Sequence, residues 1–253
     1  MNLVLAAIAT ALTVNSQAIT YLPVISTGLT TGSTSVPYAT TVQENTLSTI
    51  PCICDTGSTC YRPVCDKPFA FELKIYMNLP QVGQSLNGAL FDQIFYDTTR
   101  IHEDWHYKYD VAVANGTYGK LEAWSAQYVG GCFHTVGEAL AAGRADMENA
   151  RDVANFAFAS YLPEQDTWDA HENSGWEIQN VGGVNTYRSV NWDWGAELVA
   201  NANKINTVFF TSPGTCACIP EPDTSSLVLF LVGNSFLLMR IRHKNIGQML
   251  PGK

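Results

Sequence analysis

Apolar side chains between Ala89 and Ala114 recur at steps of three and four residues, which is the period of one helix face. The recurring positions are Phe91, Ile94, Phe95, Thr98, Ile101, Trp105 and Tyr109. Asn115-Gly116 follows directly, and this pair is typical of a helix end. The pattern therefore predicts one long helix that stops near residue 114.

Three further segments carry a clear pattern of polar and apolar positions. Residues 69–79, FAFELKIYMNL, alternate well enough to predict a strand. Residues 119–129 predict a second, shorter helix. Residues 137–161 predict a third helix, which Thr135 opens and which closes before Pro163.

The remaining body is less regular. Residues 19–50 are rich in Thr, Ser, Val and Gly with almost no charge, and we expect exposed strands or an extended leader there. A Cys-rich loop follows at 51–67. Residues 165–213 are rich in Trp, Asn and Gly and include short strand-like runs such as 206–210. The expected fold class is α+β, with a long helix, two further helices and a small sheet.

The N-terminus has the layout of a secretory signal peptide. Residues 1–18 contain an apolar run from Leu3 to Val14, and small residues, Ser16 and Ala18, stand at the −3 and −1 positions of a cleavage site. The alternative is a buried helix of the mature fold. We expect export, with residues 19–67 forming an N-terminal segment that precedes the main domain at 68–219.

The C-terminus also has a layout typical of a targeting segment. Pro220-Glu221-Pro222 precedes a short hydrophobic helix at 227–239, which is followed by a basic cluster from Arg240 to Lys244. Over residues 219–244 this order resembles the PEP-CTERM sorting signal of Gram-negative bacteria. The resemblance implies transient anchoring through 227–239, cleavage near the motif by an exosortase-type membrane enzyme, and delivery through the inner membrane to the cell surface or extracellular matrix. The alternative is a permanent tail anchor.

Composition narrows the function classes. Hydrophobic residues make up 46% of the chain, which is enough for a core and excludes a wholly disordered protein. The formal net charge is −9, so the basic surface that nucleic acid requires is lacking. We therefore expect no nucleic-acid partner.

Seven cysteines are present, and six of them lie in two tight clusters. They are Cys52, Cys54, Cys60, Cys65, Cys132, Cys216 and Cys218. In an exported protein this favours disulfides. The alternative is a Cys-rich zinc site, although the paired C-x2-C spacing of such sites is absent. We expect Cys132, outside both clusters, to be the unpaired one.

The chemistry-bearing motif is His102-Glu103-Asp104-Trp105-His106, an H-E-x-x-H sequence on the long predicted helix. Residues four apart share a helix face, so His102 and His106 can bind one Zn²⁺ together. Glu103 lies one step round the helix, where its carboxylate reaches a water that zinc makes acidic. The alternative is a pair of structural histidines on a buried helix.

This motif resembles that of the zincin metallopeptidases. The resemblance implies that His102 and His106 bind zinc and that Glu103 is the general base. The layout is also similar to that of predicted secreted bacterial zinc proteases, in which a Gln-x-x-aromatic-Asp segment precedes a glycine. Here that segment is 165–169, Gln-Asp-Thr-Trp-Asp, before Gly175.

The third metal ligand stays open at this point. Glu122, on the second predicted helix, is the first choice, because the small residues after it suit close helix packing. Glu138 is a rival, although its capping-box position gives it a structural role. The other candidates are His171 and Asp169. Asp110 continues the histidine face and is expected to orient His106.

These observations lead to a hypothesis and one alternative. The hypothesis is an exported zinc-dependent metallopeptidase, in which Glu103 activates water beside the metal to hydrolyse a protein or peptide substrate. The alternative is a non-catalytic surface or matrix protein associated with exopolysaccharide, in which any metal site is structural or vestigial.

Overall fold

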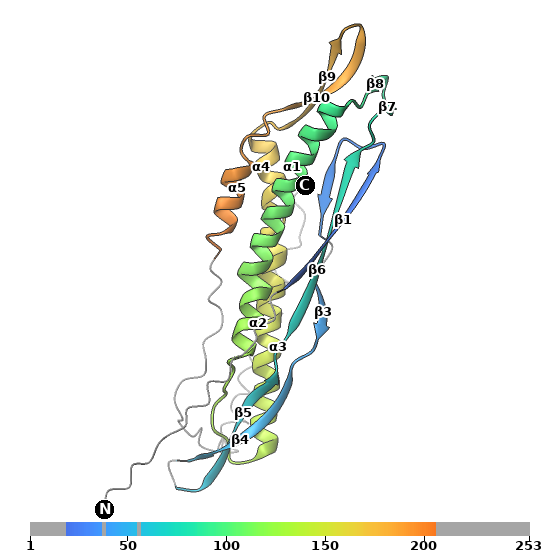
Figure 1. The fold of residues 1–253 in the computed structure, drawn as a ribbon. Coiled ribbons are helices and arrows are strands. Elements are labelled where there is room, and N and C mark those ends of the chain that lie inside the picture. The colour runs from blue at the N-terminus through green and yellow to red at the C-terminus, as the bar shows by residue number, and fades with distance from the viewer. Residues whose placement is uncertain (1–18, 37–38, 55–56, 206–253) are drawn as a thin grey trace, which may run out of the picture.

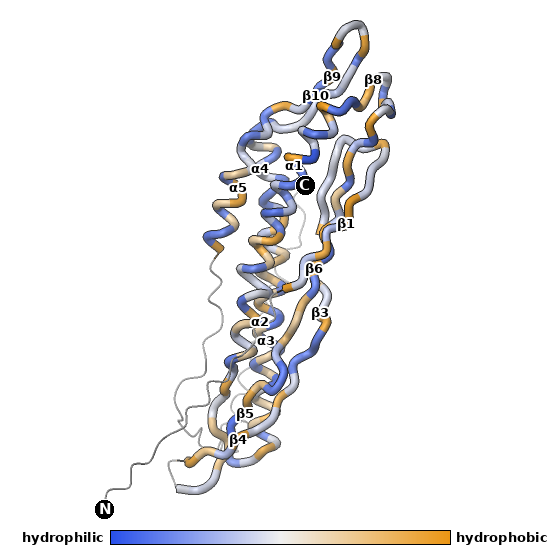
Figure 2. Tube along the Cα trace, viewed as in Figure 1, coloured by the Kyte–Doolittle hydropathy of each residue, from blue (hydrophilic) through white to orange (hydrophobic). Residues whose placement is uncertain are grey.

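A computed structural model of the chain describes residues 19–36, 39–54 and 57–205 (Figure 1). The expected signal peptide, the strand-like run at 206–210, Cys216, Cys218, the Pro220–Pro222 motif and the hydrophobic tail lie outside the described residues. Among the helices that are described, none is long and apolar enough to cross a membrane. In Figure 2 hydrophobic and hydrophilic residues alternate along these helices.

The described chain is α+β, as predicted. Its strands form three small sheets, and their bounds are β1 (Thr20–Gly28), β2 (Ser33–Ser35), β3 (Ala39–Gln43), β4 (Thr46–Ile53), β5 (Thr59–Lys67), β6 (Ala70–Pro80), β7 (Ser85–Leu86), β8 (Ala89–Leu90), β9 (Gly175–Val181) and β10 (Val184–Val190). The helices are α1 (Gln93–Ala114), the π-helical turn η1 (Asn115–Gly119), α2 (Lys120–Ser125), α3 (Val136–Tyr161), α4 (Glu164–His171) and α5 (Gly195–Ala202).

The predicted strand at 69–79 is confirmed as β6, the centre of the main sheet. β1 pairs with it in parallel on one side, while β2 and β3 pair antiparallel on the other. Alternate side chains are buried, and Leu73, Ile75 and Leu79 are fully so, whereas Lys74 and Tyr76 are exposed. Burying each aliphatic side chain contributes roughly 1.5–3 kcal/mol, so this face holds the sheet on the helices.

The prediction that the helical segment containing the histidines ends at Asn115-Gly116 is wrong. Asn115 keeps helical angles, φ −62° and ψ −40°, and the chain continues through η1 into α2. Gly116 serves a packing role instead, because a Cβ atom there would lie 2.9 Å from the carbonyl oxygen of Ile205. The second predicted helix is therefore an extension of the first rather than a separate element.

The third predicted helix is confirmed as α3, which lies beside α1 and α2 (Figure 1). Thr135 caps it, and Glu138 completes the capping box. The ring of Tyr118 joins the layers, with its centroid 4.7 Å from that of Phe71 on β6 and 5.1 Å from that of Phe158 on α3. The sheet and both long helices thus share one core.

The segment after α3 returns to the start of α1. The β9–β10 hairpin pairs with β8, and Tyr187 of β10 packs against Phe91 and Phe95 with centroids 5.1 and 5.3 Å away. Asp92 caps α1 by accepting from the Phe95 N–H, and its two carboxylate oxygens accept from Arg188 at 3.0 and 2.7 Å. These contacts fix the hairpin, and with it the segment that precedes α5.

The cysteines pair as Cys52–Cys132 and Cys54–Cys60, with Cα–Cα distances of 6.6 and 5.7 Å. Pairing of three cysteines of the first cluster agrees with the prediction of disulfides, but the expectation that Cys132 is unpaired is wrong. Cys132 comes close to Cys52 because Phe133 forms a β-bridge with Tyr61 on β5. This bridge places the loop before α3 against the β4–β5 hairpin. Among the described cysteines, Cys65 is the free one.

Replacing Arg188 by Gln is expected to lower the free energy of unfolding by about 1–2 kcal/mol, because a two-point ion pair is lost. The same change at Lys108, whose partner Asp104 is about half exposed like itself, is expected to cost less than about 0.5 kcal/mol. Urea denaturation measures both, and equal losses would contradict the role of Arg188.

The Arg188 contribution also depends on pH in a defined direction. Partial burial acts to raise the pKa of the Asp92 carboxyl, but bonds from Arg188 and the Phe95 N–H outweigh it and lower this pKa. The contribution is therefore complete above the ordinary carboxyl pKa of about 3.9 and disappears as pH falls through the lower folded value. The stability difference between the wild type and Arg188→Gln should shrink there.

Candidate metal centre

Helix α1 presents His102 and His106 on its buried face, one turn apart. Their exposed fractions are 7% and 6%, and their Nε2 atoms are 2.9 Å apart. Two Nε2 atoms reach this separation only when both rings point at the same place. The i, i+4 spacing of the motif thus produces the convergence that the sequence predicts.

The third group at this place is Asp169 of α4. Its Oδ2 lies 3.4 Å from Nε2 of His106, and its Oδ1 lies 3.7 Å from Nε2 of His102. Ligands bound at 2.0–2.1 Å to one tetrahedral zinc are roughly 3.3 Å apart. The three side chains therefore form a group that could hold a metal ion.

Gln165, one turn before Asp169 on α4, sets the orientation of His106. Its Oε1 is 2.8 Å from Nδ1 of His106, and its Nε2 donates to Oδ1 of Asp110 at 3.4 Å. An amide oxygen only accepts, so Nδ1 of His106 carries the proton of this bond, and Nε2 is the ring atom that faces His102 and Asp169. Asp110 acts on His106 through Gln165 rather than directly.

The electrostatics of the group suit a cation. Burial and the neighbouring His106 lower the pKa of His102 to about 4, so this ring is neutral at pH 7. Burial also acts to raise the pKa of Asp169, but the two histidines outweigh it and lower this pKa, so the carboxyl is ionised. A buried set of imidazole nitrogens and one carboxylate matches the ligands that Zn²⁺ prefers.

Glu103 is buried beside the histidines, with an exposed fraction of 3%. Its Oε2 accepts a 2.6 Å hydrogen bond from Thr34 on β2, and burial raises the pKa of its carboxyl to about 7. Gly32 lies against the other oxygen, because a Cβ there would stand 2.5 Å from Oε1. The turn before β2 and β2 itself therefore hold this carboxylate in place.

Aromatic rings enclose the histidines from the side of β10 and α5. The ring of Trp192 lies 4.2 Å from that of His102, and Trp194 lies 5.6 Å from His102 and 5.9 Å from His106. Gly195 follows at the start of α5, where any Cβ would overlap the ring of Trp105. This close approach explains why a bulky Trp105 is accommodated within the motif.

The other candidate ligands lie elsewhere. Glu122 is 16 residues after His106 on a nearly continuous helix, which places it about 24 Å along the axis, and it accepts a 2.7 Å bond from the Phe71 N–H. The choice of Glu122 assumed a turn at Asn115-Gly116 that does not form. Glu138 is occupied in its capping box. His171 is the last residue of α4, and its side chain is outside the described part of the structure.

Comparison with protein-family models, curated proteins and solved structures found no match. The chemical interpretation of this centre therefore depends on its own geometry.

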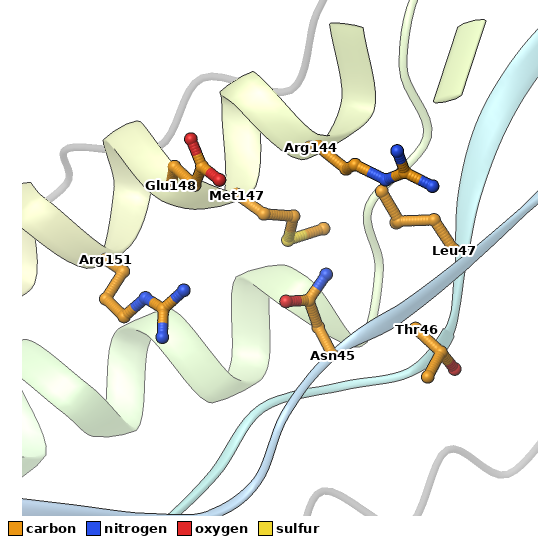
Figure 3. Close-up of a pocket in the computed structure, with 7 residues that line it drawn as sticks. All are labelled: Asn45, Thr46, Leu47, Arg144, Met147, Glu148 and Arg151. Atoms are coloured by element: carbon orange, nitrogen blue, oxygen red, sulfur yellow. The ribbon is translucent and has the colours of Figure 1, made fainter. Parts of the chain in front are cut away.

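A polar hollow between β4 and α3, at the far end of the molecule, is a poor alternative site. It is lined by Asn45, Thr46, Leu47, Arg144, Met147, Glu148 and Arg151 (Figure 3). Arg151 is paired with Glu44 at 3.1 Å, so the positive charges are largely offset by carboxylates. The hollow also has no histidine or cysteine among its lining residues.

Sequence reasoning named His102, His106 and Glu103 with their roles and had Asp169 among the candidates for the third ligand, but it did not identify the other members of this centre. Asp169 and Gln165 both fall in the segment flagged by the protease resemblance, where Gln165 received no function. No sequence pattern indicates the contact between Thr34 and Glu103, because 69 residues separate them. Trp192 and Trp194 fall in the Trp-rich stretch at 165–213, whose pattern assigns them no role.

Replacing Gln165 by Met is expected to weaken zinc binding about 10- to 100-fold, because His106 loses the contact that fixes its ring and tautomer. Gln127, which is exposed just after α2 and whose amide donates to the backbone oxygen of Ala123, provides the matched control Gln127→Met. Competition with a chelator measures both affinities. An unchanged affinity in the Gln165 variant would show that this contact does not prepare the ligand.

Proposed function

We propose that the chain is a zinc-dependent metallopeptidase of the zincin type. The supporting observation is the convergence of His102, His106 and Asp169 beside the buried carboxyl of Glu103. Three protein ligands leave one zinc position for water or substrate, which is the arrangement of catalytic zinc sites.

The protein groups divide the chemistry between them. A bound zinc ion would polarise the scissile carbonyl and acidify water. Glu103 takes the proton from the attacking water and returns it to the leaving amine. A carboxyl whose pKa is raised to about 7 is suited to both transfers near neutral pH. Thr34 orients this carboxyl through its hydrogen bond.

A second candidate is a non-catalytic surface or matrix protein with a structural metal. The burial of both histidines under Trp192 and Trp194 favours it, because a substrate needs access to the metal. In that case the metal has no exchangeable position. The two candidates differ in whether a small competing anion enters the metal coordination.

We also propose export and surface sorting through the tail at 220–244, with an exosortase-type enzyme as the processing partner. Two disulfides in the described region accord with an oxidising compartment. The substrate would be a protein or peptide.

Replacing Glu103 by Gln should abolish peptide hydrolysis, with a loss of at least about 100-fold, while zinc content and melting temperature stay close to those of the wild type. The amide keeps the shape and the bond from Thr34 but cannot accept the proton. Glu122→Gln is the matched control, being another buried glutamate of the same helical run, and should remain active. Hydrolysis that survives Glu103→Gln would exclude this mechanism.

Replacing Asp169 by Asn should reduce zinc affinity at least about tenfold, because the charged ligand is lost. Asp166→Asn changes an exposed carboxylate one turn earlier on the same helix and should bind zinc normally. Equilibrium dialysis with zinc measures both variants. Normal zinc binding by Asp169→Asn would remove Asp169 from the ligand set.

A further inference from the structure

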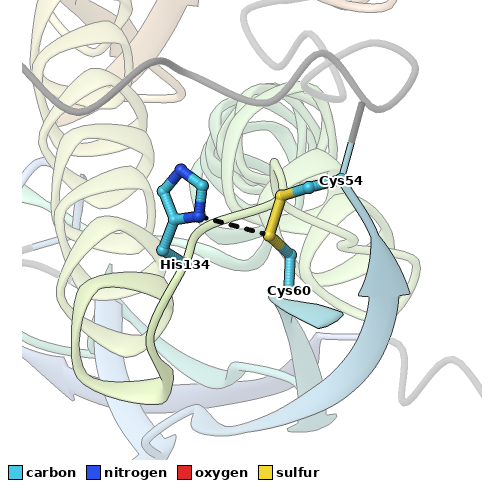
Figure 4. Close-up of side chains that lie close together, drawn as sticks. All are labelled: Cys54, Cys60 and His134. Atoms are coloured by element: carbon cyan, nitrogen blue, oxygen red, sulfur yellow. Dashed lines mark hydrogen bonds between the residues drawn. A yellow bond between two sulfur atoms is a disulfide. The ribbon is translucent and has the colours of Figure 1, made fainter. Parts of the chain in front are cut away.

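A second group of metal-binding side chains lies at the opposite end of the molecule from the histidine centre. Cys52 and Cys60 face one another across the β4–β5 hairpin, and Cys54 directly follows β4. Cys132 and His134 come from the loop before α3. Figure 4 shows His134 directed at the sulfur of Cys60.

Backbone hydrogen bonds hold the two segments together independently of the sulfur atoms. The N–H of Tyr61 donates to the carbonyl of Phe133 at 2.8 Å, and the N–H of Phe133 donates back at 2.7 Å. Gly130 adds a 2.8 Å bond to the carbonyl of Pro63. These bonds keep the cysteines and the histidine together even when no covalent link joins them.

The donor atoms lie close enough together for one metal ion to bind them once the Cys54–Cys60 disulfide is reduced. The sulfurs of Cys54 and Cys60 and a ring nitrogen of His134 lie within 4.8 Å of one another. The distance from Sγ of Cys60 to Nδ1 of His134 is 3.7 Å. Zinc bonds of about 2.3 Å to sulfur and 2.0–2.1 Å to nitrogen place tetrahedral ligands roughly 3.6 Å apart.

The surroundings suit thiolates only when positive charge accompanies them. Cys54, Cys60 and Cys132 are at most 3% exposed, so an isolated thiolate would be costly and a cation would compensate it. Nη2 of Arg62 lies 3.5 Å from the sulfur of Cys132 and supplies positive charge. Five donor side chains are thus available where a structural zinc needs four.

We propose that the reduced chain binds one thiophilic divalent cation, of which zinc is the type, through Cys54, Cys60, His134 and one sulfur of the Cys52, Cys132 pair. Each disulfide first accepts two electrons and two protons. Two thiols supply both and become a disulfide, whereas a phosphine supplies the electrons, water supplies the protons and an oxygen atom, and the phosphine oxide forms. The coordinating thiols then release their protons to water as the metal binds. Disulfide and metal exclude one another because a disulfide sulfur is not a thiolate.

The consequence is that the same two segments are joined in either redox state. When the cysteines are oxidised, the Cys52–Cys132 disulfide joins the hairpin to the loop before α3. When they are reduced, the cation joins the same two segments. This site is separate from the histidine centre, so it neither requires nor tests the peptidase activity.

Cobalt titration of the full chain tests the proposal, in the His102→Ala/His106→Ala background that removes the other site. Reduced with a phosphine, this protein should bind one Co²⁺ per chain with a thiolate-to-cobalt charge-transfer band, and the oxidised protein should show none. Cys54→Ser/Cys60→Ser should lose the band, and His134→Ala should weaken binding at least tenfold. Cys65→Ser, which changes the free thiol, should keep it.

A second measurement, made on the wild-type chain, tests the proposal if the His102→Ala/His106→Ala variant folds poorly. Zinc should raise the melting temperature of the reduced wild-type chain by several degrees, and its zinc content should rise by one per chain on reduction. Absence of a thiolate–cobalt band in the reduced protein, or an equal band in Cys54→Ser/Cys60→Ser, would overturn the proposal. Reduction that adds no zinc to the wild type would overturn it as well.

Discussion

The hydrogen bond between Gln165 and His106 is the contact on which the candidate metal centre depends. Helix α1 can present two histidines by itself, but a third ligand has to come from another element. By joining His106 to Asp110, Gln165 docks α4 on α1. Asp169 lies one turn further along α4 and so reaches both histidines. One polar contact thereby orients the His106 ring and brings Asp169 to both histidines.

The two ends of the molecule are stabilised by different means. Near the metal centre, the Asp92–Arg188 ion pair and the aromatic packing of Tyr187 hold the β9–β10 hairpin against α1. At the opposite end, the Cys52–Cys132 disulfide joins the β4–β5 hairpin to the loop before α3, and the Cys54–Cys60 disulfide spans the hairpin turn. The core around β6 connects both ends, so the N-terminal strands contribute to the same body as the helices. Through Thr34 they also reach Glu103.

What could be predicted from the sequence is what depends on local periodicity. The strand at β6, the helix α3 with its capping box, and the shared face of His102 and His106 all follow from spacing within a few residues. The continuation of α1 past Asn115-Gly116 could not be predicted, because Gly116 is required by its contact with Ile205, far along the chain. That error led to Glu122. Choosing Asp169 requires knowing how α4 docks on α1, which spacing alone does not contain.

The central claim is that two histidines of α1 and one carboxylate of α4 share a zinc ion. X-ray absorption at the zinc edge, on the oxidised full-length protein, tests it most directly. The account predicts one zinc per chain with only nitrogen and oxygen neighbours at about 2.0–2.1 Å and the outer-shell pattern of two imidazoles. A sulfur shell near 2.3 Å, or loss of the metal on simple dialysis, would contradict it.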